Sequence, residues 1–269
     1  MRQKDWYLTE EREPGFFHCE DYEDASFYLL EGTEKALLID TGMGEGNFRA
    51  MLRKLTDKPI ELAVTHAHVD HFLHACLFRD STVYMHPRDT EKLDQWYDCF
   101  ASDFEGRRCQ REDFTPITED SVIDLGGGYT VRVLEIPGHT PGSVAFYDEK
   151  RELLFTGDAI GSGIGVWMVV PGGTTLSEYR DALLHLAGRL RTLPVRRIYG
   201  GHLVQEGEPG TAHYNPLTLE TITDMAQLCE KVLAGEIDST PANNPFDEDP
   251  AFRAELGKAS MEYRLSQIR

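Results

Sequence analysis

The sequence predicts a mixed α/β (α+β) protein, folded as a four-layer αββα sandwich in which two mixed β-sheets pack face to face with helices outside. Short apolar runs of strand length alternate with helix-period stripes in the first half of the chain, and the second half loosely repeats this order. Residues of the metal-ligand type follow several of these runs directly. We therefore expect a cleft at one rim of the sandwich, where the strands end.

Strands are expected where apolar or aromatic runs end at turn residues. In chain order, the predicted strands are Trp6–Leu8, Ala25–Leu30, Lys35–Asp40, Ile60–Thr65, Thr82–Met85, Ser121–Leu125, Tyr129–Ile136, Gly142–Asp148, Leu153–Thr156 and Arg197–Gly200. Apolar residues at helical spacing predict the helices Phe48–Leu55, Asp70–Phe78, Leu176–Leu193 and Leu217–Leu233.

Two segments differ from this alternation. Residues 87–120 are charged, contain several aromatic residues and show no clean strand, so they are predicted to be an insertion of helix and loop over one edge of the core. Residues 240–269 are a C-terminal extension, which begins with a loop rich in Pro, Asn and Asp. A helix and then a closing strand at Ser260–Arg264 are predicted for the rest of it. The whole chain, residues 1–269, is predicted to be a single domain.

Composition excludes several classes of function. The formal charge of −19 argues against nonspecific binding to nucleic acid or to an anionic membrane, since both require a basic surface. No run of about 18 apolar residues is present, and the N-terminus lacks the apolar core of a secretory signal. The five cysteines are scattered and form no C-x-x-C pair, which indicates reduced thiols. A cytoplasmic protein with a small-molecule substrate is expected, with a homo-oligomer left open.

The strongest motif is T-H-A-H-V-D-H at residues 65–71, directly after the apolar run Ile60–Val64. In an extended segment, side chains two residues apart point to the same side, so His66 and His68 are able to hold one ion together. Asp70 and His71 begin the next turn and are able to reach a second position. Imidazole and carboxylate suit zinc, and also manganese or iron.

Three more ligand-type residues follow apolar runs and are flanked by glycine. They are His139 in I-P-G-H-T-P-G-S, Asp158 in F-T-G-D-A and His202 in Y-G-G-H. Taken singly, each has an ordinary explanation as a turn residue, a helix cap or a solvated group. Beside the cluster at residues 66–71, they become candidate partners of it.

With these motifs the sequence resembles the metallo-β-lactamase fold superfamily, and within it the dinuclear, glyoxalase II-like branch. The resemblance covers roughly Leu29 to His202 and includes L-L-I-D-T-G at residues 37–42. It implies a first metal ion on His66, His68 and His139, a second on Asp70, His71 and His202, and Asp158 bridging both. It also implies that Asp40 supports the ligand loop from behind. One departure is that Leu73 and His74 stand where the family usually has glycine.

The function implied is that of a dinuclear metal-dependent hydrolase, in which a metal-bound hydroxide attacks a small ester, thioester or lactone. Asp70 would bind metal and orient the attacking group. The two cofactor ions are expected to be zinc, with manganese or iron as alternatives. Trp167 and Met168, in the apolar segment 161–170, and Tyr199 are the candidate substrate contacts.

Other functions of the same fold stay open at this point. A phosphodiesterase is one, although the acidic charge and the lack of a basic arm weaken it. A mononuclear iron dioxygenase is another, because its sequence pattern is similar with fewer ligands. A non-catalytic binding module is the third, although such modules have generally lost ligands that are all filled here.

Overall fold

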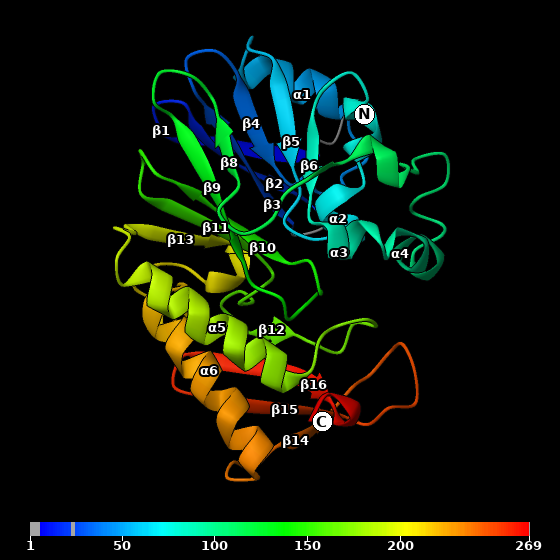
Figure 1. The fold of residues 1–269 in the computed structure, drawn as a ribbon, viewed down its shortest axis with the longest axis vertical. Coiled ribbons are helices and arrows are strands. Elements are labelled where there is room, and N and C mark those ends of the chain that lie inside the picture. Colours follow the sequence, from blue (N-terminus) through cyan, green and yellow to red (C-terminus); the bar gives the residue numbers. More distant parts are fainter. Residues whose placement is uncertain (1–5, 23–24, 269) are drawn as a thin grey trace. The chain divides into compact units, whose positions relative to one another are not determined.

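The computed structural model describes residues 6–22 and 25–268. By the density of contacts within it, the chain divides into two compact units (Figure 1). The first holds residues 1–133 and 146–151, and the second holds residues 134–145 and 152–269. The chain passes between the units three times, within β9 (Thr130–Glu135), within β10 (Val144–Asp148) and between Arg151 and Glu152.

The first unit is built on a seven-stranded mixed sheet in which the strands lie in chain order. Its strands are β1 (Tyr7–Glu13), β2 (Phe16–Asp21), β3 (Ser26–Glu31), β4 (Ala36–Ile39), β5 (Ile60–Ala63), β6 (Val83–Met85) and β7 (Thr115–Pro116). The first four strands pair antiparallel, and β4 through β7 pair parallel. Every residue of β4 is buried, which is typical of a strand covered on both faces. The strand β8 (Val122–Asp124) pairs antiparallel with β9.

Short helices connect the parallel strands of this unit. They are α1 (Phe48–Leu55), α2 (Val69–Phe72), α3 (Pro87–Thr90) and α4 (Leu93–Cys99), with single 3-10 turns at Ala75–Phe78 and Arg111–Asp113. The helix α1 begins at Asn47, whose side chain accepts a hydrogen bond from the amide of Ala50. It buries Phe48, Met51 and Leu52, as its apolar periodicity predicts.

The second unit contains two parallel strands, two long helices and a four-stranded sheet. The strands β11 (Leu153–Gly157) and β13 (Arg197–Gly200) are parallel neighbours. The helices α5 (Leu176–Leu190) and α6 (Leu219–Ala234) pack against each other, and a 3-10 turn spans Leu203–Glu206. The sheet has the order β12 (Val166–Trp167), β16 (Ala259–Arg264), β15 (Ala251–Leu256) and β14 (Thr240–Ala242), followed by the 3-10 turn Leu265–Ile268.

The prediction of a helix at the start of the C-terminal tail is wrong, because residues 251–256 form the strand β15. This segment pairs antiparallel with β16 through a turn at Gly257, whose φ is +58°. The carboxylate of Asp224 on α6 accepts a hydrogen bond from the amide of Lys258 in the same turn. The turn chemistry and the pairing outweigh the helix propensity of the segment. The closing strand itself is confirmed, with Met261 and Tyr263 buried.

Two further predictions are corrected in detail. The strand β2 was not predicted, because F-F-H-C-E-D mixes apolar and polar residues without clean alternation. The predicted helix Asp70–Phe78 is broken into α2 and a separate 3-10 turn. Helix and loop in residues 87–120 are confirmed, with only the two-residue strand β7 added.

Among the described residues, no helix combines the length and the apolar character needed to cross a bilayer.

Candidate metal centre

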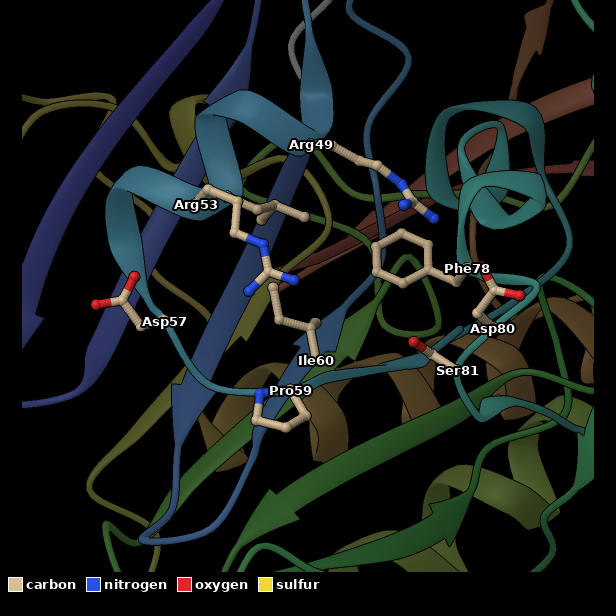
Figure 2. Close-up of a pocket in the computed structure, with 9 residues that line it drawn as sticks. Arg49, Arg53, Asp57, Pro59, Ile60, Phe78, Asp80 and Ser81 are labelled. Atoms are coloured by element: carbon tan, nitrogen blue, oxygen red, sulfur yellow. The ribbon is translucent and has the colours of Figure 1, made fainter.

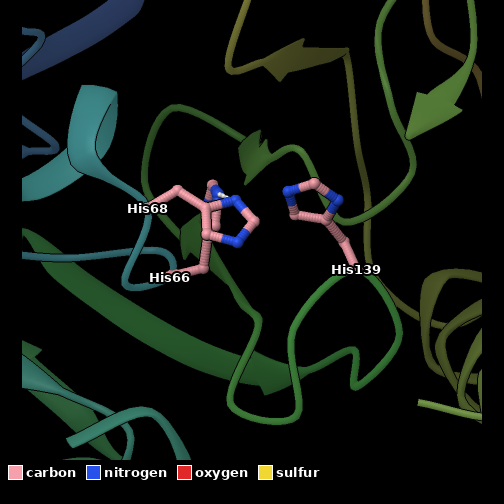
Figure 3. Close-up of side chains that lie close together, drawn as sticks. All are labelled: His66, His68 and His139. Atoms are coloured by element: carbon pink, nitrogen blue, oxygen red, sulfur yellow. Dashed lines mark hydrogen bonds between the residues drawn. The ribbon is translucent and has the colours of Figure 1, made fainter. Parts of the chain in front are cut away.

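Two of the predicted ligands lie in the loop that follows β5. His66 and His68 are buried, and their imidazole rings lie edge to face with centroids 4.6 Å apart (Figure 3). Nε2 of His66 lies 3.1 Å from Nδ1 of His68. The extended backbone therefore places two ring nitrogens together, as their i, i+2 spacing predicts.

Asp40 lies behind this loop and is itself buried. Its carboxylate accepts hydrogen bonds from the amide of Thr65 at 2.7 Å, from the hydroxyl of Thr65 at 2.7 Å and from Nδ1 of His71 at 2.9 Å. Burial raises the pKa of Asp40, while the His71 ring and the Thr65 donors oppose that shift. Asp40 also has a φ of +62°, a strained conformation for a non-glycine residue, which the surrounding hydrogen bonds hold in place.

His71 and Asp70 lie on α2 next to this support. Because Nδ1 of His71 donates to Asp40, its Nε2 is left with the lone pair that a metal ion would accept. That Nε2 lies 3.3 Å from Oδ2 of the half-buried Asp70. The carbonyl of His71 accepts a hydrogen bond from the amide of Thr41, which fixes the helix against the end of β4.

Two residues that the sequence analysis did not single out also contact the ligand loop. The buried carboxylate of Asp89, on α3, accepts a hydrogen bond from the amide of Ala67 at 2.8 Å. The ring of Trp96, on α4, lies edge to face with His68, with centroids 4.6 Å apart. Both belong to the segment 87–120, where nothing in the local pattern indicates such a role.

In the second unit, His139 lies in the turn between β9 and β10, and it is drawn in Figure 3. Its Nδ1 lies 2.7 Å from the carbonyl oxygen of Trp167. A carbonyl oxygen only accepts, so Nδ1 carries the proton and Nε2 has the lone pair. Nε2 lies 3.8 Å from Oδ2 of Asp158.

Asp158 and His202 meet because β11 and β13 are parallel neighbours. Each residue follows the carboxyl end of its strand, and these ends lie at the same edge of the sheet. Nε2 of His202 lies 3.3 Å from Oδ2 of Asp158. The second unit therefore brings together its three predicted ligands, which lie far apart along the chain.

Close packing under these loops comes from Tyr179 on α5, which is fully buried. Its hydroxyl donates a hydrogen bond to the carbonyl of Ala159, next to Asp158. A Cβ atom at Gly138 would lie 2.1 Å from Cδ2 of Tyr179, so only glycine fits before His139. The side chain of Tyr179 thus supports the loop of Asp158 and the loop of His139.

The donor atoms of these side chains fit a divalent metal ion. The first unit supplies His66, His68, Asp70 and His71, and the second supplies His139, Asp158 and His202. Imidazole nitrogens and carboxylate oxygens are the usual ligands of zinc. In His71 and His139, the hydrogen bond made by the other ring nitrogen selects the tautomer that a ligand requires.

The three predicted substrate contacts differ in exposure. Trp167 is 41% exposed, and its ring lies 5.4 Å from that of Phe246 in the C-terminal extension. Met168 is fully buried in the second unit. Tyr199 is half-buried and stacks on Phe155, with ring centroids 5.5 Å apart. Trp167 alone among the three offers a large free apolar surface.

A pocket of about 390 Å³ lies elsewhere in the first unit (Figure 2). Arg49 and Arg53 of α1 line it together with Phe78 and Ile60. Ile60 begins β5, whereas the histidine loop follows the end of that strand. This pocket is therefore separate from the histidine loop.

Comparison with known proteins adds a family. The family model described as "Metallo-beta-lactamase superfamily" matches residues 22–202. An uncharacterized protein of Aquifex aeolicus (strain VF5) is 34% identical over 149 residues, which are 53% of this chain and 68% of that protein. The human acyl-coenzyme A thioesterase MBLAC2 is 26% identical over 196 residues, which are 61% of this chain and 70% of the thioesterase. The probable metallo-hydrolase YqgX of Bacillus subtilis (strain 168) is 28% identical over 170 residues, 60% of this chain and 80% of YqgX.

Solved structures confirm the predicted fold class. The mono-zinc form of the metallo-beta-lactamase FIM-1 from Pseudomonas aeruginosa superimposes with a TM-score of 0.63. The match covers 84% of this chain and 96% of FIM-1 at 17% sequence identity. At that identity the likeness shows the αββα fold alone. The family match shows that this chain belongs to the metallo-beta-lactamase superfamily, and with the hydrolase-named relatives it identifies the chain as a metal-dependent hydrolase.

Proposed function

We propose that the ligands of the two units together bind two divalent metal ions, with zinc as the expected metal. His66, His68 and His139 would hold the first ion, Asp70, His71 and His202 the second, and Asp158 both. The observation that carries this proposal is the pair of backing hydrogen bonds, from His71 to Asp40 and from His139 to the carbonyl of Trp167. Each leaves the Nε2 lone pair of a buried histidine available to a cation.

The reaction that we infer is hydrolysis of a small ester or lactone, and above all of an acyl thioester. Bound divalent ions supply Lewis acidity, which lowers the pKa of water and polarises a carbonyl oxygen. We assign to Asp70 the orientation of the attacking water and the acceptance of its proton, and the short distance from its Oδ2 to Nε2 of His71 supports this assignment. The thioesterase named among the relatives supports the thioester class.

Exposed aromatic surface in the second unit supports an apolar acyl or aryl group in the substrate. The rings of Trp167 and Phe246 lie together, and the backbone of Trp167 bonds directly to His139. An acyl chain packed on these rings would be held close to a ligand loop. Replacing Trp167 by Ala should therefore raise KM more for long acyl chains than for acetyl.

Metal analysis combined with a substrate panel tests this proposal. The purified protein should bind about two zinc ions per chain, hydrolyse acyl-coenzyme A thioesters and lose turnover on chelation. The panel includes a lactone and bis(p-nitrophenyl) phosphate, which separate the ester class from a phosphodiesterase. Asp158→Asn should lower the metal content, whereas Asp181→Asn, an exposed aspartate on α5, should leave it unchanged. Turnover that survives complete removal of metal would overturn the proposal.

A further inference from the structure

The strand β16, near the end of the chain, pairs with the segment whose residue Trp167 contacts the proposed metal ligand His139. The strand β16 lies beyond residues 22–202, which the family model covers. It pairs in parallel with β12, matching Val166 with Met261 and Trp167 with Glu262. The amide of Met168 donates to the carbonyl of Glu262 at 2.8 Å, which continues the pairing one residue further. The backbone of residues 166–168 is therefore fixed by the C-terminal extension.

Gln267, in the 3-10 turn after β16, adds a side-chain clamp on the same segment. It is 3% exposed, and its Nε2 donates to the carbonyl oxygens of Met168 and Thr174 at 3.0 Å each. Its Oε1 accepts a hydrogen bond from the amide of Arg264 at 2.8 Å. The amide group of Gln267 thus bridges both ends of residues 168–174 and is itself held in orientation by β16.

Both ends of that segment contact the turn that carries His139. The carbonyl of Trp167, next to Met168, accepts from Nδ1 of His139 at 2.7 Å. The amide of Thr174 donates to the carbonyl of Gly138 at 2.9 Å. Gln267 therefore binds the carbonyl of Thr174, whose own amide contacts the turn, and the carbonyl of Met168, which follows Trp167 in the chain.

We propose that Gln267 is a positioning residue for His139, resting on the assignment of His139 as a metal ligand. By binding the carbonyls of Met168 and Thr174, Gln267 holds the neighbouring carbonyl of Trp167 in place. That carbonyl then keeps the proton on Nδ1 of His139 and directs Nε2 toward the metal. The C-terminal extension is then part of the metal centre, although it supplies no ligand itself. Outer partners of this kind typically contribute about 10- to 100-fold to metal affinity.

Two substitutions and one control test the role of Gln267. Gln267→Met has a similar shape and removes all three hydrogen bonds. Gln267→Glu keeps an acceptor for the amide of Arg264 and carries the test if the Met variant does not fold. The control is Tyr263→Phe, which removes the 2.8 Å contact between the Tyr263 and Ser239 hydroxyls and none of the hydrogen bonds of Gln267. His139→Ala gives the reference for full loss of the ligand.

Zinc affinity and the tautomer of His139 are the two readouts. Competition with a chromogenic chelator should show zinc bound about 10-fold or more weakly in both Gln267 variants. In the metal-free protein, ¹⁵N NMR of the imidazole should show a smaller fraction of His139 protonated at Nδ1. The Tyr263→Phe variant should match the wild type in both measurements.

The outcomes separate this inference from the proposed function. Unchanged zinc affinity and an unchanged His139 tautomer in folded Gln267 variants would overturn the positioning role while leaving the metal centre intact. A wild-type protein that binds no zinc would overturn the metal assignment, whatever the tautomer does. An equal loss of zinc affinity in Tyr263→Phe would show a general effect of the C-terminal sheet and would also overturn the role of Gln267.

Discussion

The two units hold their proposed metal ligands by different means. In the first unit the ligands are nearly contiguous, and buried carboxylates support them, since Asp40 and Asp89 accept hydrogen bonds from His71 and from the ligand loop. In the second unit the ligands come from three separate loops. A backbone carbonyl at Trp167 and the ring of Tyr179 support them. Charge therefore organises the proposed ligands of the first unit, and backbone pairing with close packing organises those of the second.

Because of this difference, the two units should respond to different kinds of substitution. A carboxylate that accepts several buried donors cannot be removed without leaving those donors unsatisfied, so single substitutions in the first unit should be costly. A carbonyl cannot be removed by substitution at all, so the second unit should respond instead to changes in volume and pairing. Three predictions follow this contrast from the largest effect to the smallest.

Asp40→Ala is expected to give the largest loss. It leaves the amide and hydroxyl of Thr65 and Nδ1 of His71 without their acceptor, in a fully buried place. Each buried donor left without a partner costs about 1–3 kcal/mol, and three donors lose their acceptor here. Urea denaturation should show a loss of this size, and zinc affinity should fall with it.

The matched control for Asp40 is Asp181→Ala. Asp181 pairs with Arg180 on the surface of α5, and its side chain is 66% exposed. An exposed pair contributes below about 1 kcal/mol, so this variant should unfold almost as the wild type does. If the two variants lost equal stability, the view that charge organises the first half would be wrong.

How much of the site the sequence predicts follows from the same contrast. The motif at residues 65–71 is visible because ligand types recur at short, fixed spacing after an apolar run. The other ligands become candidates only beside that motif, since each has a bland explanation as a turn or a cap. The groups that support the ligands of the second unit cannot be recognised in this way. Every residue has a backbone carbonyl, and Tyr179 has the pattern of any buried position on a helix.

The fold shows the same limit at the C-terminal tail. Ala251–Leu256 contains good helix formers, and its local propensity gives no reason to expect a strand. It becomes β15 because β16 lies next to it and Asp224 caps the turn at Gly257. Long-range pairing decides this element, whereas α1, with its own cap and apolar face, is predicted correctly from its residues alone.

Acid should weaken the first unit through its buried histidines. Burial lowers the pKa of His18 to about 4, and the nearby Arg12 adds to the shift. Burial likewise lowers the pKa of His74 to about 4, with repulsion from Arg107 as the second cause. The unfolded chain takes up protons below about pH 6.5, which the folded protein resists. The contribution of these two neutral histidines to the free energy of unfolding is therefore fully present above about pH 6.5 and is lost as the pH falls toward 4.

His18→Phe tests this dependence away from the ligands. Phenylalanine keeps the stacking on Tyr28, whose ring lies 5.6 Å from that of His18, and cannot take up a proton. Between pH 7 and pH 4, the free energy of unfolding should fall by about 3 kcal/mol less in this variant than in the wild type. An unchanged slope in His18→Phe would exclude His18 as a source of the acid sensitivity.

The smallest expected effects come from two glycines of the second unit, and they have opposite signs. In Gly138→Ala the new Cβ would lie 2.1 Å from the ring of Tyr179, so the His139 turn must shift. Overpacking of this kind costs about 1–3 kcal/mol. In Gly188→Ala, on α5, the new Cβ meets nothing within 4 Å, and helix propensity should stabilise the protein by about 0.5–1 kcal/mol. If Gly138→Ala were as harmless as Gly188→Ala under urea, packing against Tyr179 could not be what holds the His139 turn, and the backbone contacts to Trp167 and Thr174 would have to hold it alone.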